Sequence, residues 1–382
     1  MPRLTYPFPL TSLRVPEDLH WIDLKTGIYL DWFASKINTW QKAHGRHDLP
    51  WQQNISAYRV WLSEIMLQQT QVETVKPYFI RFLEKYPEVS ELARASTDDV
   101  LALWTGLGYY NRARNLHKTS IIIHKDYQGA FPSCLDRLTE LPGIGRSTAG
   151  AILALSMGKR GVILDGNVKR VLSRFHLIEG YLEERTTTDE LWWHADRHTP
   201  AIETNVYTQG IMDLGATICK RSAPACSECP LVNRCGAHQH NLAAQIPRRK
   251  PKRKKPVKDS LFFIICNEDK EVIVEKRAES GVWAGLWSPL ERCKEYSLDQ
   301  ILEELDLHED SVLNIATESP IKHSFTHFQI KATPIYVRVR SSACSEFGAG
   351  FRWVNSDMIR KKRVDVGMSA LALKLINNGP LG

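Results

Sequence analysis

A basic segment from Arg248 to Lys258 divides this chain of 382 residues into two parts. It carries eight lysine or arginine residues, two prolines and no acid, so it cannot join a hydrophobic core. It also accounts for the net charge of +7, because the rest of the chain has 42 basic and 43 acidic residues. We interpret the segment as a solvated linker. A nucleic-acid-binding arm and a nuclear localisation signal are weaker alternatives.

The residues before the linker, from about Leu24 to Gly236, show helical periodicity. In Ser56–Thr70, apolar residues at 58, 61, 62, 65 and 66 have the spacing of a buried helix face. The same pattern predicts helices at Asp98–Leu103, Arg112–Ile123, Ser147–Met157, Val168–His176 and Val206–Ile218. Glycines and prolines separate these segments. We therefore expect an all-α region.

The pattern changes after the linker. Short runs rich in β-branched and aromatic residues predict strands at Ser260–Cys266, Glu271–Lys276 and Ala332–Val339. Helices are expected at Leu298–Leu305 and Met368–Ile376, which makes this part a smaller α+β domain. The predicted organisation is an N-terminal extension (1–24), an all-α region (25–235), the linker (236–258) and the α+β domain (259–382).

Four of the eight cysteines have the spacing C-x6-C-x2-C-x5-C. They are Cys219, Cys226, Cys229 and Cys235. Disulfides are not expected in a chain without a secretory signal, so we predict four thiolates around one metal centre. Zinc and a 4Fe–4S cluster fit this spacing equally well. Four cysteine ligands leave no open coordination position, which favours a structural role.

The stretch Leu141–Asp165 places a Pro-Gly-x-Gly turn between two helical segments. Gly143 and Gly145 allow a tight turn with exposed backbone N–H groups, and the next helix N-terminus adds positive potential. Such a hairpin can hold a nucleic-acid phosphate without regard to base sequence. Ordinary turns between two helices use the same residues, so the motif alone is moderate evidence.

Asp165 closes this stretch and has no other acid within ten residues on either side. Because it precedes a predicted helix, its first interpretation is an N-cap. The apolar residues 162–164 before it, and Lys169 and Arg170 after it, indicate in addition a carboxylate that stays ionised.

Glu64 is a second isolated acid, within the predicted helix Ser56–Thr70. A glutamate on such a helix usually lies on the solvated face, but a buried one could serve as a general acid. Glu64 and Asp165 are therefore a candidate acid pair. Hydrolysis of a glycosidic bond needs one acid to protonate the leaving group and one carboxylate to stabilise the cationic sugar.

Five segments together resemble the MutY-type adenine DNA glycosylases, which are helix-hairpin-helix glycosylases related to endonuclease III. They are Leu141–Ile152, Val162–Leu172, Val60–Val72, Gly106–Leu116 and the four-cysteine motif. The resemblance extends from about Leu24 to the C-terminus. It implies two helical subdomains and a 4Fe–4S cluster at the four cysteines. It also implies a partner, double-stranded DNA with adenine opposite 8-oxoguanine or guanine, from which the adenine is flipped out and removed in base excision repair.

The resemblance also implies roles for individual residues. Glu64 would protonate the adenine ring, Asp165 would stabilise the oxocarbenium-like sugar, and Asn167 would help to hold that carboxylate. Gln69 and Tyr109 would wedge into the base stack. The residues expected near the DNA or the lesion are Gln69, Thr70, Leu107, Gly108, Tyr109, Gly143, Gly145 and Ser147. The positions expected around the adenine pocket are His47, Trp51 and Gln209.

The residue type at position 147, a serine, discriminates between the possible activities. Endonuclease III-like enzymes carry at this hairpin position a lysine that forms a Schiff base and cuts the strand. A serine cannot form that adduct, so we predict a monofunctional glycosylase. The alternatives are a bifunctional glycosylase with lyase activity, against which Ser147 argues, and a non-catalytic DNA-binding module, against which the acid pair argues.

The C-terminal domain resembles the MutT-like (Nudix-fold) domain of the same family. Its predicted helix offers only Glu303 and Glu304 in place of the hydrolase signature, so hydrolysis of nucleoside triphosphates is not expected. Lys322–Ile330 matches the loop that probes 8-oxoguanine, with Thr326 in place of a serine.

Nothing in the sequence indicates secretion or membrane insertion. No apolar run is long enough for a transmembrane helix. The first 20 residues contain four prolines and lack the apolar core of a signal peptide. We expect a cytoplasmic monomer, associated with the nucleoid if the source is bacterial.

Overall fold

The computed structural model describes residues 20–22, 29–248, 250–251, 254–325, 327–343, 350–361 and 365–379. Most of the predicted N-terminal extension lies outside these residues, and so does Thr326. The chain divides into two compact units that alternate along the sequence. The first unit comprises Met1–Asp48 and Arg146–Lys250, and the second comprises Leu49–Gly145 and Pro251–Gly382.

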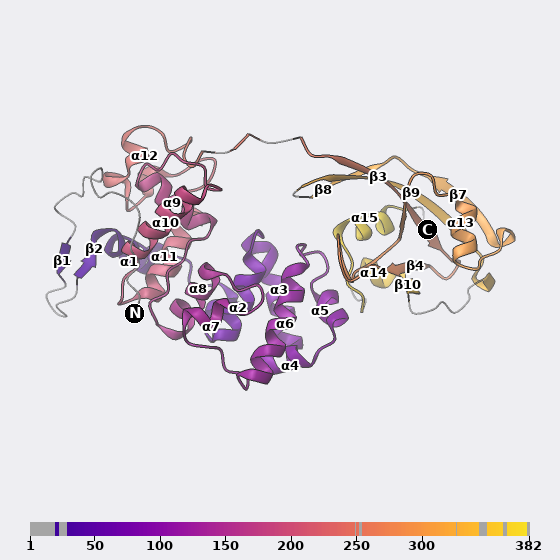
Figure 1. Cartoon of the computed structure of the whole chain (residues 1–382), viewed down its shortest axis with the longest axis horizontal. Coiled ribbons are helices and arrows are strands. Elements are labelled where there is room, and N and C mark those ends of the chain that lie inside the picture. Colours follow the sequence, from indigo (N-terminus) through magenta and orange to yellow (C-terminus); the bar gives the residue numbers. More distant parts are fainter. Residues whose placement is uncertain are drawn as a thin grey trace. The chain divides into compact units, whose positions relative to one another are not determined.

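The first unit is helical and is organised around α11, which packs against α1, α8 and α9 (Figure 1). Its elements are β1 (His20–Ile22), β2 (Tyr29–Asp31), α1 (Trp32–His44), α8 (Arg146–Met157), α9 (Gly166–Phe175), α10 (Arg185–His198), α11 (Thr204–Thr217) and α12 (Gly236–Gln239). Phe33, Leu172 and Ile211 are buried in its hydrophobic core. The helices predicted at 147–157, 168–176 and 206–218 are confirmed.

The first part of the second unit is also helical. Its helices are α2 (Ala57–Leu67), α3 (Val72–Lys85), α4 (Val89–Arg94), α5 (Thr97–Leu103), α6 (Asn111–Asp126) and α7 (Leu135–Thr139). Ser56 caps α2, because its Oγ accepts a hydrogen bond from the backbone N–H of Arg59 at 3.2 Å. The five apolar residues predicted to face the core from α2 are all buried.

The second part of this unit is a mixed β-sheet with strand order β10-β4-β3-β9-β7. Strands β5, β6 and β8 pair with β4, β3 and β9, and only β3 and β9 are parallel among the paired strands described. The elements are β3 (Val257–Cys266), β4 (Glu271–Lys276), β5 (Trp287–Ser288), β6 (Leu290–Arg292), α13 (Leu298–Glu304), β7 (Val312–Thr317), β8 (Ile321–Ser324), β9 (Gln329–Val339), β10 (Phe351–Asn355), α14 (Ser356–Arg360) and α15 (Ala370–Asn378).

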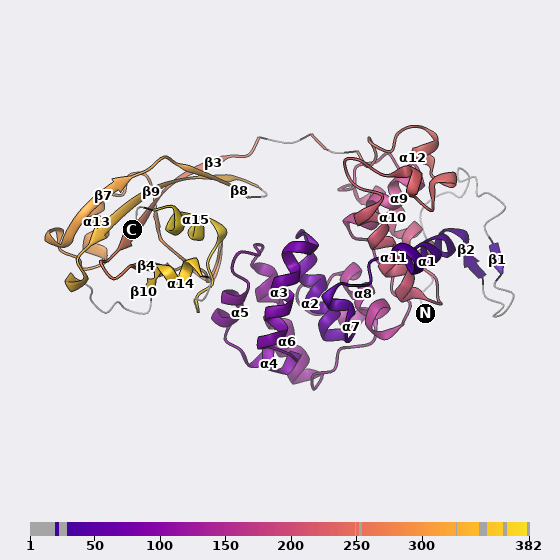
Figure 2. The same cartoon turned by 180° about the vertical axis from the view of Figure 1, so that it is seen from behind.

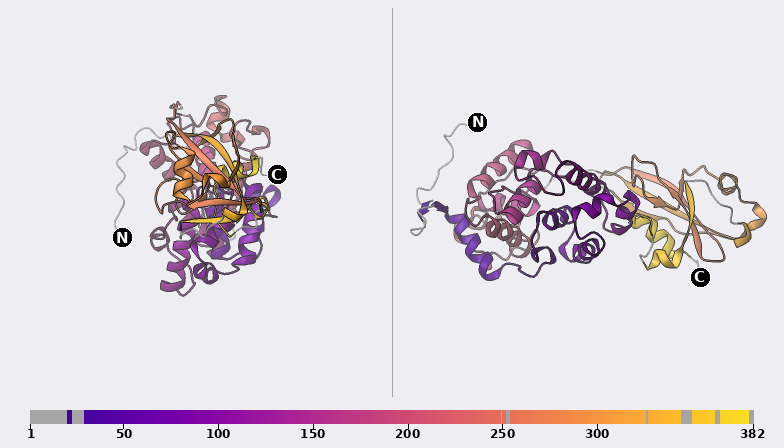
Figure 3. Two further views of the ribbon diagram at one scale, coloured as in Figure 1. Left: turned by 90° about the vertical axis from the view of Figure 1, so that its right-hand side faces the viewer. Right: turned by 90° about the horizontal axis from the view of Figure 1, so that it is seen from below.

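Helices cover both faces of this sheet (Figures 1 and 2). Successive side chains of a strand point to opposite faces, so the neighbouring Phe262 and Phe263 of β3 enter two different cores. Phe263 is buried with Ile301 of α13, and Phe262 with Leu375 of α15. Figure 3 shows the yellow C-terminal helices along one face of the orange strands. The predicted combination of an all-α region and an α+β domain is confirmed.

The segment between the cysteine motif and the sheet is partly structured. Helix α12 begins at Gly236, and β3 begins at Val257. Arg248 forms an ion pair with Glu179 of the first unit, and Lys258 forms one with Glu291 of the second, at 2.9 Å. Each end of the basic segment is therefore paired with an acid of the unit to which that end belongs.

The helices described are of ordinary globular length. The longest, α6, has 16 residues, whereas a bilayer crossing needs about 20 apolar ones. Within the described part of the chain, no helix combines the length and apolarity that crossing a membrane requires.

Candidate functional site

Asp165 is the N-cap of α9. Its Oδ1 accepts a hydrogen bond from the backbone N–H of Val168 at 2.7 Å. The carboxylate thereby satisfies one of the N–H groups that a helix leaves unpaired at its start. The capping role expected from the sequence is confirmed, and it fixes the carboxylate at the positive end of the helix dipole.

Opposing effects act on the pKa of the Asp165 carboxyl group. Burial raises its pKa above the ordinary value of 3.8 and is the largest effect. Hydrogen bonds from the backbone N–H groups of Val168 and Asn167 lower the pKa, and so does the charge of Arg170. The sequence predicted that neighbouring bases keep this acid ionised. Arg170 does act in that direction, but burial outweighs it, so the pKa is raised.

Asn167 and Arg170 fix the first turn of α9 against α11. Arg170 Nη2 donates to Asn167 Oδ1 at 2.8 Å and to the carbonyl of Gly215 at 2.6 Å. A Cβ at Gly215 would lie 2.6 Å from Asn167 Cβ, so the two helices approach closely only because this residue is glycine. The side chain of Asn167 pairs with Arg170, whereas its backbone N–H acts on the Asp165 carboxyl group by lowering its pKa.

Ser147 lies in the first turn of α8. Its Oγ accepts a hydrogen bond from the backbone N–H of Leu164 at 2.9 Å. Leu164 directly precedes Asp165, so the serine holds the segment that leads into the N-cap. A lysine side chain offers no acceptor and could not make this bond.

The hairpin turn before α8 exposes its two glycines. Gly143 has φ +79°, a conformation that favours glycine. The turn is fixed on α6, because Thr119 Oγ1 donates to the carbonyl of Pro142 at 2.8 Å. At Gly145 a Cβ would meet nothing within 4 Å in the described structure, so packing does not require glycine there. An exposed glycine with free space leaves room for the backbone of another molecule.

The four cysteines follow α11 in a loop with two short turns, Cys226–Glu228 and Val232–Arg234. Burial raises the pKa of Cys229 to about 12, and the charges of the other three thiols add to the rise. This electrostatic coupling places the four thiols near one another.

The four sulfurs are nevertheless spread more widely than the ligands of one ion. Among the described residues, only one set of three or more potential ligand residues has all its ligand atoms within 4.8 Å of one another. That set consists of three histidines. No three cysteine sulfurs therefore meet that closely. A tetrahedral zinc ion holds its sulfurs about 3.8 Å apart, given a Zn–S bond of about 2.3 Å.

Arg174 connects α9 with the cysteine loop. It is 2% exposed, and its Nη1 donates to the sulfur of Cys219 at 3.2 Å and to the carbonyl of Lys220 at 2.8 Å. Arg170 Nε also donates to the carbonyl of Cys219, at 2.7 Å. One helix thus carries Asp165 at its start and two arginines that hold the cysteine loop. Arg174 was not predicted from the sequence, although its spacing of four residues from Arg170 indicates a shared helix face.

Glu64 lies on α2 in the second unit. It is half-buried, and its neighbours Ser63 and Ile65 are 1% and 2% exposed. The alternative of a fully solvated helix face therefore does not fit this residue.

Gln69 and Tyr109 have left-handed backbone conformations, with φ +58° and +51°. This conformation costs a non-glycine residue about 1–2 kcal/mol. Both residues are exposed, Tyr109 by 52%, whereas the adjacent Tyr110 is buried. Without the family resemblance both tyrosines would be expected in the core, and for Tyr109 that expectation is wrong. Exposed, strained residues of this kind are typical of functional loops.

Arg112 joins the two loops that carry these residues, and the sequence analysis did not identify it. Its Nη1 donates to the carbonyls of Ile65, Met66 and Gln68 at 2.7–2.9 Å. Its Nη2 donates to Thr70 Oγ1 at 3.1 Å and to the carbonyl of Gly108 at 3.0 Å, with a longer bond to that of Leu107 at 3.4 Å.

The guanidinium of Arg112 is 5.4 Å from the ring centre of Tyr109, and the residue is 8% exposed. Burial lowers its pKa to about 10, so it remains charged near neutral pH. A buried arginine that binds carbonyl groups of both loops fixes the two strained residues relative to each other.

Two of the residues predicted around the adenine pocket belong to the first unit. Gln209 Nε2 donates to the fully buried Asp213 at 2.9 Å. Arg46 Nε also donates to Asp213, at 2.8 Å. His47 follows Arg46, and its Nε2 lies 3.1 Å from the carbonyl oxygen of Gln41. Asp213, which the sequence analysis missed, therefore holds both Gln209 and the residue before His47.

Trp51, the third predicted pocket residue, belongs to the second unit. It lies in the turn Pro50–Gln52 and is 7% exposed. Its ring packs edge-to-face on Phe79, with ring centres 5.6 Å apart. In the described structure this tryptophan is thus largely a core residue.

The loop predicted to probe 8-oxoguanine contains Thr326, which lies outside the described residues. Stacked aromatic rings hold the described part of the loop together. Phe325 and Phe328 stack with centres 4.5 Å apart, and Phe325 lies 5.0 Å from Trp283. Aromatic contacts therefore hold the loop.

The two glutamates of α13 differ in their surroundings. The carboxylate of Glu304 accepts hydrogen bonds from Arg292, and Arg292 also bonds Glu275 at 2.8 Å. Glu303, on the same helix, is exposed. Glu304 is thus part of an ion-pair network with Arg292 at its centre.

Two family models match the chain. The model described as HhH-GPD superfamily base excision DNA repair protein matches residues 62–194, and that described as NUDIX domain matches residues 261–377. The first match contains the second half of α2 with Glu64, the hairpin and Asp165. The second contains almost all of the β-sheet part.

Curated relatives resemble most of the chain. The adenine DNA glycosylase of Buchnera aphidicola subsp. Schizaphis graminum is 38% identical over 80% of this chain and 88% of that protein. The enzyme of the same name from subsp. Acyrthosiphon pisum is 42% identical over 80% of this chain and 87% of that protein. The mouse adenine DNA glycosylase is 28% identical over 88% of this chain and 76% of that protein.

Proposed function

Because the chain belongs to the adenine DNA glycosylases, which hydrolyse N-glycosyl bonds in base excision repair, we propose that its substrate is adenine opposite 8-oxoguanine or guanine in double-stranded DNA. We further propose that it releases adenine without cutting the strand. The observation that carries most weight is the half-buried carboxylate of Asp165, fixed at the N-cap of α9 with its pKa raised by desolvation.

Glu64 supplies the proton that the leaving base requires. Adenine leaves far more readily when a ring nitrogen is protonated, and a positioned carboxyl group is a suitable general acid. The half-buried position of Glu64 between the buried Ser63 and Ile65 of α2 supports this role, because it fixes the carboxyl group on a rigid helix.

Asp165 stabilises the sugar as its positive charge develops. Burial makes the anion costly in the absence of a nearby cation, so an oxocarbenium-like sugar interacts with it more favourably than the neutral substrate does. The hydrogen bonds from Val168 and Asn167 hold the carboxylate in place, so little reorganisation is needed during the reaction.

Gln69 and Tyr109 insert into the duplex when adenine is flipped out. Their exposure and strained backbone support this role, and Arg112 keeps the two loops together. Side chains that wedge into the stack offset the cost of unstacking, which is a few kcal/mol per step. Gly143 and Gly145 bind backbone phosphate at the hairpin, and Thr70, Leu107 and Gly108 lie near the lesion.

The activity is monofunctional because no lysine stands at position 147. A lyase needs an amine that attacks the sugar and forms a Schiff base. The hydroxyl of Ser147 is engaged with the backbone N–H of Leu164 and positions the N-cap instead. Water is therefore the final acceptor of the sugar.

Cys219, Cys226, Cys229 and Cys235 hold a 4Fe–4S cluster. The coupling among the four thiols and their wide spacing support a cluster over one zinc ion. When bound, the cluster stabilises the loop after α11. Through Arg170 and Arg174 this loop supports α9 and its N-cap.

The Nudix-like part recognises the base opposite adenine. Thr326 offers a hydroxyl there, and the stacked Phe325 and Phe328 support the loop that carries it. The ion pair of Glu304 with Arg292 removes one of the two acids of α13 from metal binding, so this part serves recognition rather than nucleotide hydrolysis.

Single-turnover release of adenine from a duplex with one A:8-oxoguanine pair tests the proposal. Wild type should release adenine, whereas Glu64→Gln and Asp165→Asn should bind the duplex and release adenine at least about 100-fold more slowly, given the usual contribution of a general acid. Duplexes with A:G, A:T and A:C pairs measure specificity. Product DNA should stay uncut until treated with alkali.

Lack of adenine release by iron-replete wild type would overturn the proposal. Strand cutting that co-purifies with the enzyme, together with a borohydride-trapped adduct at turnover rates, would overturn the monofunctional part alone. Equal rates on A:8-oxoguanine and A:T would overturn the specificity alone.

A further inference from the structure

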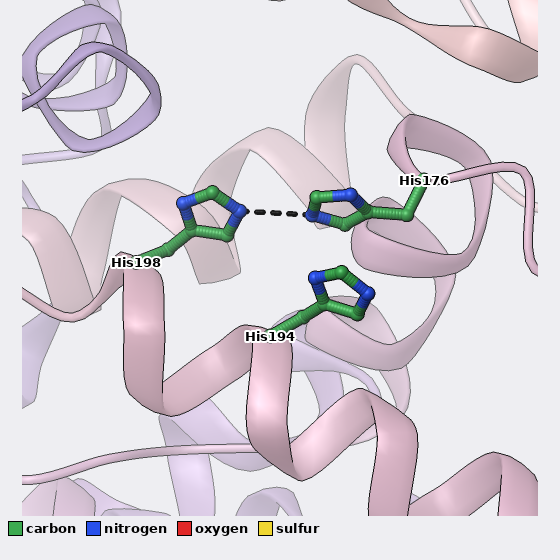
Figure 4. A group of neighbouring side chains, drawn as sticks. All are labelled: His176, His194 and His198. Carbon is green, nitrogen blue, oxygen red and sulfur yellow. Dashed lines mark hydrogen bonds between the residues drawn. The ribbon is translucent and has the colours of Figure 1, made fainter. Parts of the chain in front are cut away.

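Three histidines of the first unit lie together and take no part in the site described above. They are His176, His194 and His198, and their ligand nitrogens all lie within 4.8 Å of one another. His194 and His198 are one turn apart on α10, and His176 is the C-cap of α9. Figure 4 shows the three rings converging from these two helices.

Two of the rings share a hydrogen bond that leads to a carboxylate. His176 Nε2 and His198 Nε2 are 2.8 Å apart (Figure 4), and His198 Nδ1 bonds the carboxylate of Asp31. Because the carboxylate accepts the Nδ1 proton, Nε2 of His198 has a free lone pair, and His176 Nε2–H donates to it. A carboxylate that holds the far nitrogen of a histidine is the usual outer support of a metal ligand.

The carboxylate of Asp31 bonds this histidine and does not cap its own helix. Asp31 is the N-cap residue of α1 but makes no side-chain cap bond. Capping is the common use of an aspartate at this position and stabilises a helix by about 1 kcal/mol. The structure instead directs its carboxylate to His198, which is 3% exposed.

The third ring has an unused nitrogen. His194 Nδ1 is buried and has no hydrogen-bond partner in the described structure. Its ring stacks on that of His176, with centres 3.6 Å apart. A buried nitrogen without a hydrogen-bond partner is available as a metal ligand.

We propose that His176, His194 and His198 bind one divalent transition-metal ion, with zinc as the best-suited ion and Asp31 as the outer support of His198. Imidazole suits zinc, nickel and copper, and two histidines four residues apart on one helix can share an ion. On binding, His176 changes tautomer by exchange with water: Nε2 releases its proton, Nδ1 takes one up, and the Nε2 lone pair of the still neutral imidazole goes to the metal.

Binding requires two small movements. A tetrahedral ion with metal–nitrogen bonds of about 2.0–2.1 Å holds two nitrogens about 3.3 Å apart. The pair His176–His198 therefore opens from its present 2.8 Å. The His194 ring turns about its Cβ–Cγ bond out of the stack, so that a nitrogen points to the ion.

The local charges nearly balance. Arg197, whose guanidinium lies over Trp193, contributes a positive charge that lowers the pKa of His194 and opposes a cation, whereas the carboxylate of Asp31 favours one. Three protein ligands leave a fourth position to water. The ion would join the end of α9, which carries Asp165 at its start, to α10, so we assign it a stabilising role.

Zinc uptake by the full-length, iron-replete chain tests this proposal. After competition with a chromophoric chelator, wild type should hold one zinc per chain in addition to its iron. His194→Gln and His198→Gln should lose it, and the control His308→Gln, which removes an exposed histidine of the second unit, should keep it. Asp31→Asn, which retains all three ligands, should bind about 10–100-fold more weakly.

X-ray absorption at the zinc edge gives a second, independent readout. The proposed site has only nitrogen and oxygen neighbours near 2.0–2.1 Å, whereas zinc in the cysteine site shows sulfur near 2.3 Å. Sulfur neighbours, or uptake that survives His194→Gln and disappears in Cys229→Ser, would overturn the proposal. So would no uptake by iron-replete wild type. Iron content and thermal unfolding show which variants are folded.

Discussion

Ser147 accepts a hydrogen bond at 2.9 Å from the backbone N–H of Leu164, the residue that precedes Asp165. The first turn of α8 thereby fixes the segment that presents the N-cap of α9. Leu164 is 4% exposed, so water cannot easily replace the serine. We propose that Ser147 positions this segment, at the place where the family resemblance puts the catalytic lysine of endonuclease III-like enzymes.

Ser147→Ala should lower the free energy of unfolding by about 1–3 kcal/mol, because it leaves the buried N–H of Leu164 without a partner. Adenine release in a single turnover should slow by about fivefold, since a shift of Asp165 worth ~1 kcal/mol changes a rate by that factor. Denaturant unfolding and rapid-quench kinetics measure the two effects.

Ser156→Ala is the matched control, because Ser156 lies on the same helix. Its hydroxyl donates to the carbonyl of Ile152 at 2.6 Å, so its removal leaves no N–H group unsatisfied. Equal losses in the two variants would show that the bond to Leu164 has no special role.

Asp165→Asn should abolish activity and stabilise the fold at neutral pH. The folded-state pKa of Asp165 is raised by burial, so ionisation of its carboxyl costs stability. That cost is absent below the ordinary pKa of 3.8 and grows as the pH rises through the raised value. Asparagine keeps the cap bond without the charge. Thermal unfolding from pH 8 to pH 5 should show an advantage for the variant that shrinks towards acid pH.

Asp99→Asn should behave in the opposite way. Hydrogen bonds from Ser96 and Lys85 lower the pKa of Asp99, so its ionised form stabilises the fold. That contribution is present above the ordinary pKa and is lost as the pH falls through the lowered one. The variant should therefore be less stable than wild type at neutral pH. A gain in stability for both variants would refute the explanation by burial.

Local patterns in the sequence predicted α2, α5, α6, α8, α9, α11, α13 and α15, but not α1 or α10. The spacing of apolar residues in Ser56–Thr70 predicted α2, because a helix face depends on neighbours a few residues apart. The cap role of Asp165 was predicted for the same reason. By contrast, α3 was not predicted, because it continues through Pro77, which usually ends a helix.

Features that depend on distant residues could not be predicted in this way. The parallel pairing of β3 with β9 joins strands more than 60 residues apart. The sequence indicated Arg112 only as an ordinary helix residue. In the structure its side chain binds a loop more than 40 residues earlier in the chain. The raised pKa of Asp165 depends on burial, which nearby bases in the sequence do not reveal. His176 and His194 likewise meet only through the packing of α9 and α10.

Arg112→Lys should destabilise the second unit and weaken lesion binding. An ammonium group cannot reach the carbonyl groups of both loops from one position, so several buried oxygens lose a charged donor. We expect a loss of about 3 kcal/mol or more in unfolding free energy. The loops of Gln69 and Tyr109 should become mobile, which hydrogen exchange can measure. Arg94→Lys, on the exposed surface of α4, should change stability by less than about 0.5 kcal/mol.

If the four cysteines hold the proposed iron–sulfur cluster, Cys229→Ser should remove it and slow adenine release, although Cys229 is not one of the proposed catalytic acids. Iron analysis and the broad visible absorbance should both fall to background, while Cys293→Ser, a change of an exposed cysteine in the second unit, should retain both. Loss of the cluster should release Arg174 and Arg170 from the loop at Cys219 and so loosen α9. Faster hydrogen exchange in Gly166–Phe175, together with slower adenine release, would show this coupling. Full activity without iron would contradict it.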